Sequence, residues 1–331
     1  MKRHLICTLM VLTAGAVVNR AAAQVDPHFT QYYVHTSWMN PALTGLFDGD
    51  YRVSAIYRNQ WGNVASPFST IGGSAELVTG NNINLGLNVI TQKAGDGGYS
   101  YTTGYGNFNY TGVRFGTGEF QRIAMAIQGG FIQRRFNPSK LVFSDQWNPV
   151  TGQTRPTQEA FNKTSSISFD AGAGFLYYDA TPNKKANVFA GFFASHITRP
   201  ENEFIGNEKM PIRYTAHAGV RLVLSETVSL TPNALFLSQG SAQEKMLGLY
   251  AQLRAAASTD VLLGVNYRVK DAISAHAGFN YNNLVLSVSY DVNTSQLGKM
   301  VNGTNSFEVS IAYTGRKKVR TPEVEFVCPR L

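Results

Sequence analysis

Apolar and polar residues alternate with a period of two over many short stretches of this chain, and this alternation constrains its fold more than any other feature. Charged side chains fall on one of the two alternating faces, at Arg221, Arg268 and Glu308. A charge that faces lipid costs about 2 to 4 kcal/mol at the bilayer midplane, so in a membrane that face must line a lumen. The pattern is typical of strands with lipid or a core on one side only. The clearest cases are residues 284–291 and 307–314, and residues 214–224 and 261–270 show the same alternation.

The composition argues against a helical membrane protein and against disorder. Beyond the N-terminal region there is no run of about 18 apolar residues, which a membrane-spanning helix would need. Charged residues make up only 15% of the chain and hydrophobic residues 44%, which favours an ordered protein with a sizeable core. A soluble, secreted all-β protein, either a sandwich or a propeller, would show the same alternation and is the alternative. The low charge and the lack of an obvious repeat period argue against it.

Walking along the chain, we predict fourteen strands. An even number lets an antiparallel sheet close without a free edge, which a bilayer requires because it holds no water for edge amides. The predicted fold is therefore all-β, a transmembrane antiparallel β-barrel of about 14 strands. The strands are expected near residues 51–58, 68–79, 83–93, 101–111, 120–133, 165–178, 187–197, 211–224, 227–237, 244–255, 258–269, 272–280, 283–291 and 306–314.

The lengths of the connections predict an orientation. The longest ones, at 134–164, 198–210 and 292–305, all fall at one end of the predicted barrel, whereas most at the other end are short. Outer-membrane barrels have long external loops and short periplasmic turns. We therefore expect a protein of the Gram-negative outer membrane with both termini in the periplasm.

The N-terminus has the pattern of a secretory signal peptide. A basic start and an apolar stretch over residues 5–18 precede three alanines, and we expect cleavage before Gln24. The predicted layout is a signal peptide at 1–23, an N-terminal periplasmic or plug segment at 24–50, the barrel at 51–314 and a periplasmic tail at 315–331.

No catalytic or cofactor-binding pattern stands out. The six His residues are scattered, and His217 and His276 have no acid at metal-ligand spacing. Phosphate-binding and nucleophile motifs are absent as well, so we expect no enzyme, no cofactor and no metal site. Most basic residues are spread along an exported chain, which disfavours nucleic-acid binding. Cys328 would be the single cysteine of the mature chain, either an unpaired thiol without a role or one that faces a partner.

Motifs near the two ends carry a family signal. Residues 26–33 read D-P-H-F-T-Q-Y-Y and residues 40–45 read N-P-A-L-T-G. This opening resembles the PorP/SprF family of outer-membrane proteins of the type IX secretion system, and the resemblance spans essentially the whole mature chain. The matching positions are Asp26, Pro27, Phe29, Gln31, Tyr32, Asn40, Pro41 and Gly45, then Tyr57, Arg58, Gln60 and Trp61 of a Y-R-x-Q-W element, Tyr290 and Asp291 of an S-Y-D element, and Cys328, Pro329 and Arg330 of a C-P-R end.

The resemblance implies a non-enzymatic component of a protein-export machine. Its partners would be outer-membrane lipid and either machine subunits or the C-terminal domains of secreted cargo, in some members for surface adhesins and gliding motility. The departures from the family pattern are small, with Leu43-Thr44 in place of Tyr-Ala and Leu331 in place of a final aromatic residue. A different class of function stays open, a passive porin or a hydrophobic-solute transporter with an N-terminal hatch, because alternation and barrel size permit it equally.

The N-terminal motifs allow two interpretations. As turn and strand-entry signals, Asp26-Pro27 and Asn40-Pro41 would be purely structural. Alternatively, residues 24–50 fold up into the barrel as a plug or dock a periplasmic partner. We prefer the plug, because a barrel of about fourteen strands encloses a lumen that needs filling. Arg58 is expected to point inward or to lipid headgroups, and Trp61 to lie at the membrane interface.

Two further segments are candidate partner contacts. Connection 134–164 carries Trp147 and several Phe residues, and apolar residues on a long exposed loop suggest a binding surface. The tail joins a basic stretch to alternating residues around Phe326, which could add as a strand to a partner. We expect the tail to dock a periplasmic machine subunit, with a flexible or barrel-capping tail as the alternative.

Overall fold

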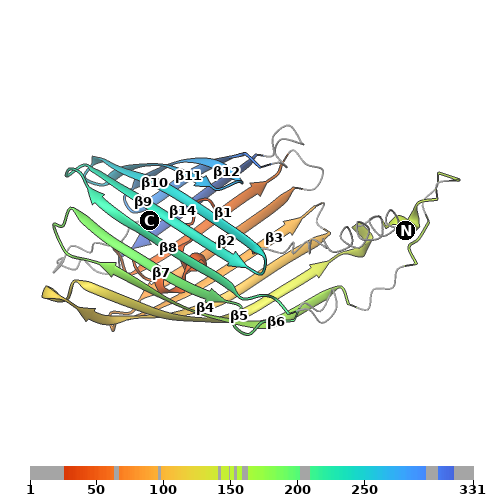
Figure 1. Cartoon of the computed structure of the whole chain (residues 1–331), viewed down its shortest axis with the longest axis horizontal. Helices are drawn as coiled ribbons and strands as arrows, with labels where there is room; N and C mark the ends of the chain where they lie inside the picture. Colours follow the sequence, from red (N-terminus) through yellow and green to blue (C-terminus); the bar gives the residue numbers. More distant parts are fainter. Residues whose placement is uncertain are drawn as a thin grey trace, which may run out of the picture.

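The computed structural model is a closed antiparallel barrel in which each strand pairs with its neighbours in sequence and β14 pairs with β1 (Figure 1). It describes residues 26–62, 67–95, 98–140, 143–148, 150–152, 155–158, 163–201, 209–295 and 305–316. The prediction of fourteen strands is confirmed. The strands are β1 (Tyr51–Gln60), β2 (Phe68–Val78), β3 (Ile83–Ala94), β4 (Tyr99–Phe115), β5 (Gln121–Phe136), β6 (Ser165–Asp179), β7 (Ala186–Ser195), β8 (Arg213–Val223), β9 (Val228–Gln239), β10 (Ala242–Ala256), β11 (Thr259–Arg268), β12 (Ala272–Tyr281), β13 (Leu284–Asn293) and β14 (Ser306–Gly315).

Alternation within each strand sorts side chains between the outer wall and the lumen. On β13, Val288 and Tyr290 are half exposed on the outer wall, while Ser287 and Ser289 are buried inside. The predicted lumenal face is confirmed for Arg268 and Glu308, which are almost fully buried. The barrel interior therefore carries charge, whereas the outer wall presents aliphatic and aromatic side chains.

The two ends of the barrel differ. The short-turn mouth holds the connections after the even-numbered strands, such as the Asn282-Asn283 turn, where both residues have positive φ as a tight hairpin turn demands. The long-connection mouth holds those after the odd-numbered strands. There the connection between β5 and β6 reaches well beyond the barrel (Figure 1). It contains the short helices η3 (Pro138–Lys140) and η4 (Ser144–Gln146).

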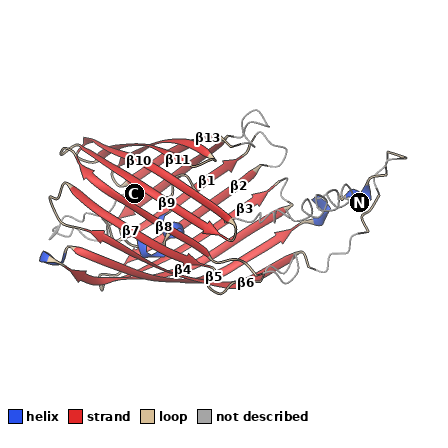
Figure 2. Ribbon diagram, viewed as in Figure 1, coloured by secondary structure: helices blue, strands red, loops and turns tan. Residues whose placement is uncertain are grey.

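Residues 26–47, which we call the lumenal segment, lie inside the barrel (Figure 2). The segment forms the one-turn helix α2 (Thr36–Met39) and the 3-10 helix η1 (Pro41–Leu43). The second helix begins here because Asn40 caps it, its side-chain oxygen accepting from the amide of Ala42, and because Pro41 at the first position needs no donor. No helix among the described residues is long and apolar enough to cross a membrane.

The lumenal segment runs from one mouth to the other. Asp26 contacts Gln239 and Arg213, which lie at the long-connection mouth, whereas Asp50 bonds Gly315 at the short-turn mouth. The prediction that both termini lie in the periplasm concerns residues outside the described ones and stays a prediction. The described chain itself begins and ends at opposite mouths. The physical reason is that the lumenal wall supplies charged and amide partners at both mouths and between them, so many polar groups of the segment are hydrogen-bonded as it threads the barrel.

Candidate functional site in the barrel lumen

A cluster at the long-connection mouth holds the start of the lumenal segment. The carboxylate of Asp26 accepts from the Tyr101 hydroxyl at 3.0 Å, from His196 Nε2 at 2.5 Å and from Arg213 at 3.3 Å. On its other side, His196 Nδ1 donates to Asp170 at 2.7 Å. His196 follows the end of β7, so it joins the segment to the rim of the barrel.

The pKa values in this cluster favour a protonated His196 beside an ionised Asp26. Burial by itself would lower the pKa of His196, but Asp26 and Asp170 outweigh it and raise the pKa to about 9. Burial would likewise raise the pKa of Asp26, yet His196 and Arg213 hold that pKa well below its usual range. His196 is therefore an imidazolium at neutral pH, and both of its ring N–H groups donate to carboxylates.

A second cluster holds the lumenal segment at Thr30 and Gln31, a few residues after Asp26. The backbone amides of Thr30 and Gln31 donate to the two carboxylate oxygens of Glu308 at 2.7 and 2.8 Å. Arg58 bonds both Glu308 and Asp291, and it reaches Asp291 at 3.1 Å. Because these groups are nearly inaccessible to water, each charge depends on its partners inside the lumen.

Two further residues, Arg268 and Gln31, belong to this cluster. Arg268 donates to Asp291 at 2.7 Å, so two arginines offset two carboxylates. Gln31 is fully buried, and its amide nitrogen donates to Ser289 at 3.2 Å while its oxygen accepts from Ser310 at 2.6 Å. Four strands, β1, β11, β13 and β14, thereby bind one short stretch of chain, which gives the segment a unique register.

The second half of the segment has its own anchors. The side-chain nitrogen of Asn40 donates to the carbonyl of Phe175 at 3.1 Å. Farther on, the Gly45 amide donates to Glu76 at 2.8 Å, and Glu76 is paired with Arg52 at 2.7 Å. Gly45 has φ +74, and a Cβ there would lie 2.4 Å from the Asn84 side chain, so the position requires glycine.

Aromatic side chains of the segment pack against the wall between these anchors. Tyr33 lies 5.1 Å from the ring of Tyr250 and 5.0 Å from that of His276. Trp38 donates from its ring nitrogen to the Pro27 carbonyl at 2.9 Å, which ties the two parts of the segment together. Burying each such ring stabilises the lodged segment by roughly 2 kcal/mol.

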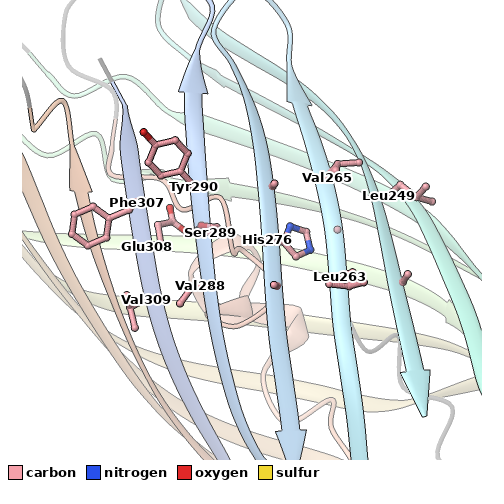
Figure 3. Close-up of a pocket in the computed structure, with 14 residues that line it drawn as sticks. Leu249, Leu263, Val265, His276, Val288, Ser289, Tyr290, Phe307, Glu308 and Val309 are labelled. Carbon is pink, nitrogen blue, oxygen red and sulfur yellow. Dashed lines mark hydrogen bonds between the residues drawn. The ribbon is translucent and has the colours of Figure 1, made fainter. Parts of the chain in front are cut away.

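One hollow is found in the lumen and another on the outer wall. A cavity of about 140 Å³ remains between the segment and the wall at the short-turn mouth, lined among others by Leu46, Phe47 and Arg52. A groove of about 750 Å³ lies instead on the outer wall over β10 to β14, where Ala275 and Ala277 make a hollow among larger apolar side chains (Figure 3). Within the described residues, no three His, Cys, Asp or Glu side chains gather as metal ligands would.

Comparison with known proteins decides the family. Residues 21–313 match the family model described as type IX secretion system membrane protein PorP/SprF. The chain belongs to the PorP/SprF family. No curated protein matches it. The family and the barrel fold together support a place in the outer membrane.

Solved structures show the same fold at low identity. The toluene transporter TbuX of Ralstonia pickettii is 12% identical, with a TM-score of 0.55 over 86% of this chain and 93% of that one. A deletion mutant of TodX, a monoaromatic hydrocarbon channel, is 7% identical, with a TM-score of 0.50 over 82% of this chain and 91% of that one. These likenesses establish the barrel architecture and no more than that.

Several of the PorP/SprF motif positions that we predicted as site residues meet in the lumen. Asp26, Gln31, Arg58 and Asp291 all take part in the two charged clusters. Tyr32 bonds Asn233 across the lumen. The remaining motif positions in the lumen have structural roles. Phe29 packs against the wall, and the Pro27 carbonyl accepts from Trp38. Asn40 caps η1, Pro41 begins it, and Gly45 takes the left-handed backbone conformation.

Other predicted PorP/SprF positions lie elsewhere. Tyr57 and Tyr290 face outward, and Tyr57 packs against Phe307 with ring centroids 5.9 Å apart. Gln60 ends β1, and Trp61 packs edge-on against Phe68 at the long-connection mouth. Trp147 is exposed on the loop between β5 and β6. Cys328, Pro329 and Arg330 lie outside the described residues, as do Gln24 and the predicted signal peptide.

Sequence reasoning missed important partners in the lumen. His196, Asp170 and Arg213 were not singled out, and Arg268 and Glu308 were noted only as marking the lumenal face. A usable signal was present for the last two, because a charge inside a transmembrane strand needs a partner in the lumen. For the first three no local pattern points to Asp26, since their pairing depends on how the segment threads the barrel.

Proposed function

We propose that this protein is a non-enzymatic outer-membrane component of the type IX secretion system that binds secreted cargo or machine subunits. In this proposal the barrel is a membrane-embedded scaffold and not a conduit. The observation that carries it is the lodged lumenal segment, tied at Asp26, at Thr30 and at Gly45 to wall residues from most of the circumference. A barrel filled in this way acts through its surfaces.

The loop between β5 and β6 is the partner surface that we favour. It projects past the long-connection mouth, and Trp147 is 55% exposed there. Hydrogen bonds join two parts of the loop, because the Asp145 carboxylate accepts from the Thr157 hydroxyl at 3.0 Å and from the Gln158 amide at 2.6 Å. An exposed tryptophan beside these hydrogen bonds is suited to protein contacts, because tryptophan is enriched among the residues that carry most of the binding energy of an interface.

A deletion strain tests the scaffold hypothesis. We expect loss of surface display for particular secreted proteins with unchanged permeability of the outer membrane. Complementation with Trp147→Ala should restore insertion of the barrel but only part of the display. Normal display in the deletion strain would contradict the proposal.

A gated channel for small solutes is the second candidate. It is favoured by one observation, namely that the lumenal segment is bound to the wall largely through side chains and is not a strand of the sheet. Displacement of the segment would therefore leave the barrel itself intact. Purified protein in a planar bilayer distinguishes the candidates, because steady conductance supports the channel and a silent barrel supports the scaffold.

A further inference from the structure

A row of polar side chains crosses the outer wall near the long-connection mouth. The strand register places Ser69 of β2 beside Lys93 of β3, Lys93 beside Ser100 of β4, Ser100 beside Arg135 of β5, and Arg135 beside Ser165 of β6. Each of the five continues the outward alternation of its strand, and Lys93 and Arg135 are exposed. The wall thus presents two cations with hydroxyls between and beside them.

The spacing of this row suits a phosphate. Lys93 and Arg135 lie two strands apart, which is roughly 10 Å in a sheet, with Ser100 between them. Long side chains from both strands can converge on an anion above the serine, and arginine can bind phosphate through two parallel N–H groups. Within the described part of the chain, neither cation makes an ion pair or a side-chain hydrogen bond that would occupy it.

The wall below the row is apolar. Two rungs farther into the barrel the outward positions are Val89, Gly104, Phe131 and Phe169 in register, and the Phe131 ring covers Gly104. Val89, Phe131 and Phe169 are exposed, as a lipid-facing surface would be. The intervening rung holds Thr91 and Thr102, whose hydroxyls are 3.2 Å apart. The outer wall therefore changes from polar to apolar within a few residues below the row, just as a lipid changes from its polar headgroup to its apolar acyl chains.

We propose that Lys93, Ser100 and Arg135 bind the phosphate of a phosphorylated lipid in the leaflet at the long-connection mouth. The acyl chains of that lipid lie along Val89 and Phe131. A free phosphate ion would gain nothing from the apolar wall, which is why the site is assigned to a lipid. The site is separate from the lumenal clusters and does not depend on the secretion role.

Native mass spectrometry of the purified, full-length barrel in detergent tests this site. The probe is diphosphorylated lipid A, compared with the same lipid after enzymatic removal of its phosphates. We expect the double variant Lys93→Gln/Arg135→Gln to weaken the first binding event about 30-fold, because each cation contributes about 1 kcal/mol at an anionic surface and 1.4 kcal/mol is tenfold. The dephosphorylated lipid should bind wild-type protein no better than it binds the variant.

Lys245 on β10 supplies the matched control. It faces outward at the same mouth, but its strand neighbours are Phe236 and Val269, which offer no hydroxyl. Lys245→Gln should change the first binding event by less than about twofold, since the site needs converging groups and not charge alone. Equal weakening by Lys245→Gln and by the single variants Lys93→Gln and Arg135→Gln, or equal binding of the dephosphorylated lipid, would overturn the proposal. The exchange Lys93→Arg/Arg135→Lys keeps both charges and should retain binding.

Discussion

At the residue scale, Arg58 joins the two carboxylates of the second lumenal cluster. It is 1% exposed and bonds Glu308 and Asp291. Arg58→Gln leaves two buried carboxylates short of a partner, and breaking a buried pair in this way costs about 3 to 5 kcal/mol. The free energy of unfolding, measured by denaturant titration in detergent, should fall by that amount. Arg114→Gln, which removes an exposed arginine bonded only to Asn82 among the described residues, should change it by less than about 1 kcal/mol.

His196 makes the attachment at the long-connection mouth depend on pH. Its pKa in the folded protein is about 9, above the ordinary value of 6.5, so its contribution is complete below pH 6.5 and is lost as pH rises through 9. Asp26 has the opposite dependence, because its pKa is lowered and its contribution is lost only in strong acid. Raising the pH from 6.5 to 10 should cost the wild-type protein about 3 kcal/mol of stability. In His196→Gln that step should be absent from the pH profile, and an unchanged profile would contradict this assignment.

At the element scale, the lumenal segment depends on tight passages through the barrel. Gly45→Ala places a Cβ against Asn84 in a left-handed backbone conformation, and such strain costs about 1 to 3 kcal/mol. We expect faster protease cleavage within residues 26–47 while the strands stay intact. Gly152 also has a positive φ, but a Cβ there would meet nothing within 4 Å. Gly152→Ala therefore carries the backbone cost without the clash, and it should leave cleavage of the segment unchanged.

At the scale of the whole molecule, the lumenal segment decides whether the barrel is open. Deleting residues 26–47 removes the contents of the lumen but none of the strand pairing. The shortened protein should insert and conduct steadily in a planar bilayer, because a barrel of this size encloses more space than its own wall side chains fill. The full-length protein should be silent under the same conditions. Equal conductance of the two proteins would show that the segment does not obstruct the barrel.

The C-terminal tail is the segment that we expect to dock a subunit of the secretion machine. It leaves the barrel at the short-turn mouth, where Arg316 pairs with Asp48 at 2.5 Å. Truncation after Arg316 keeps that pair, so the barrel should insert and resist heat as before. Secretion should fail if residues 317–331 dock a machine subunit, as we propose. Unimpaired secretion by the inserted truncation would refute the docking role.

Alternation along the sequence predicted the number of strands and the face of most strand residues, although the ends of some strands differ, as at β4 (Tyr99–Phe115), predicted at 101–111. These features follow from period two, which is local, and a strand cannot shift by one residue without moving its whole apolar set to the wrong side. The end motifs identified the family for the same reason, because they are contiguous stretches.

The contacts inside the barrel could not be predicted from local sequence. Asp26 and His196 are 170 residues apart in sequence, and Thr30 and Glu308 are 278 apart. No local pattern encodes such pairs, because they exist only once closure between β1 and β14 creates a lumen and the segment passes through it. The same closure creates the passage along which the segment carries Asp26 to the mouth opposite Gly315. Alternation reports which face a side chain is on, but not which of the distant groups on that face will satisfy a buried charge.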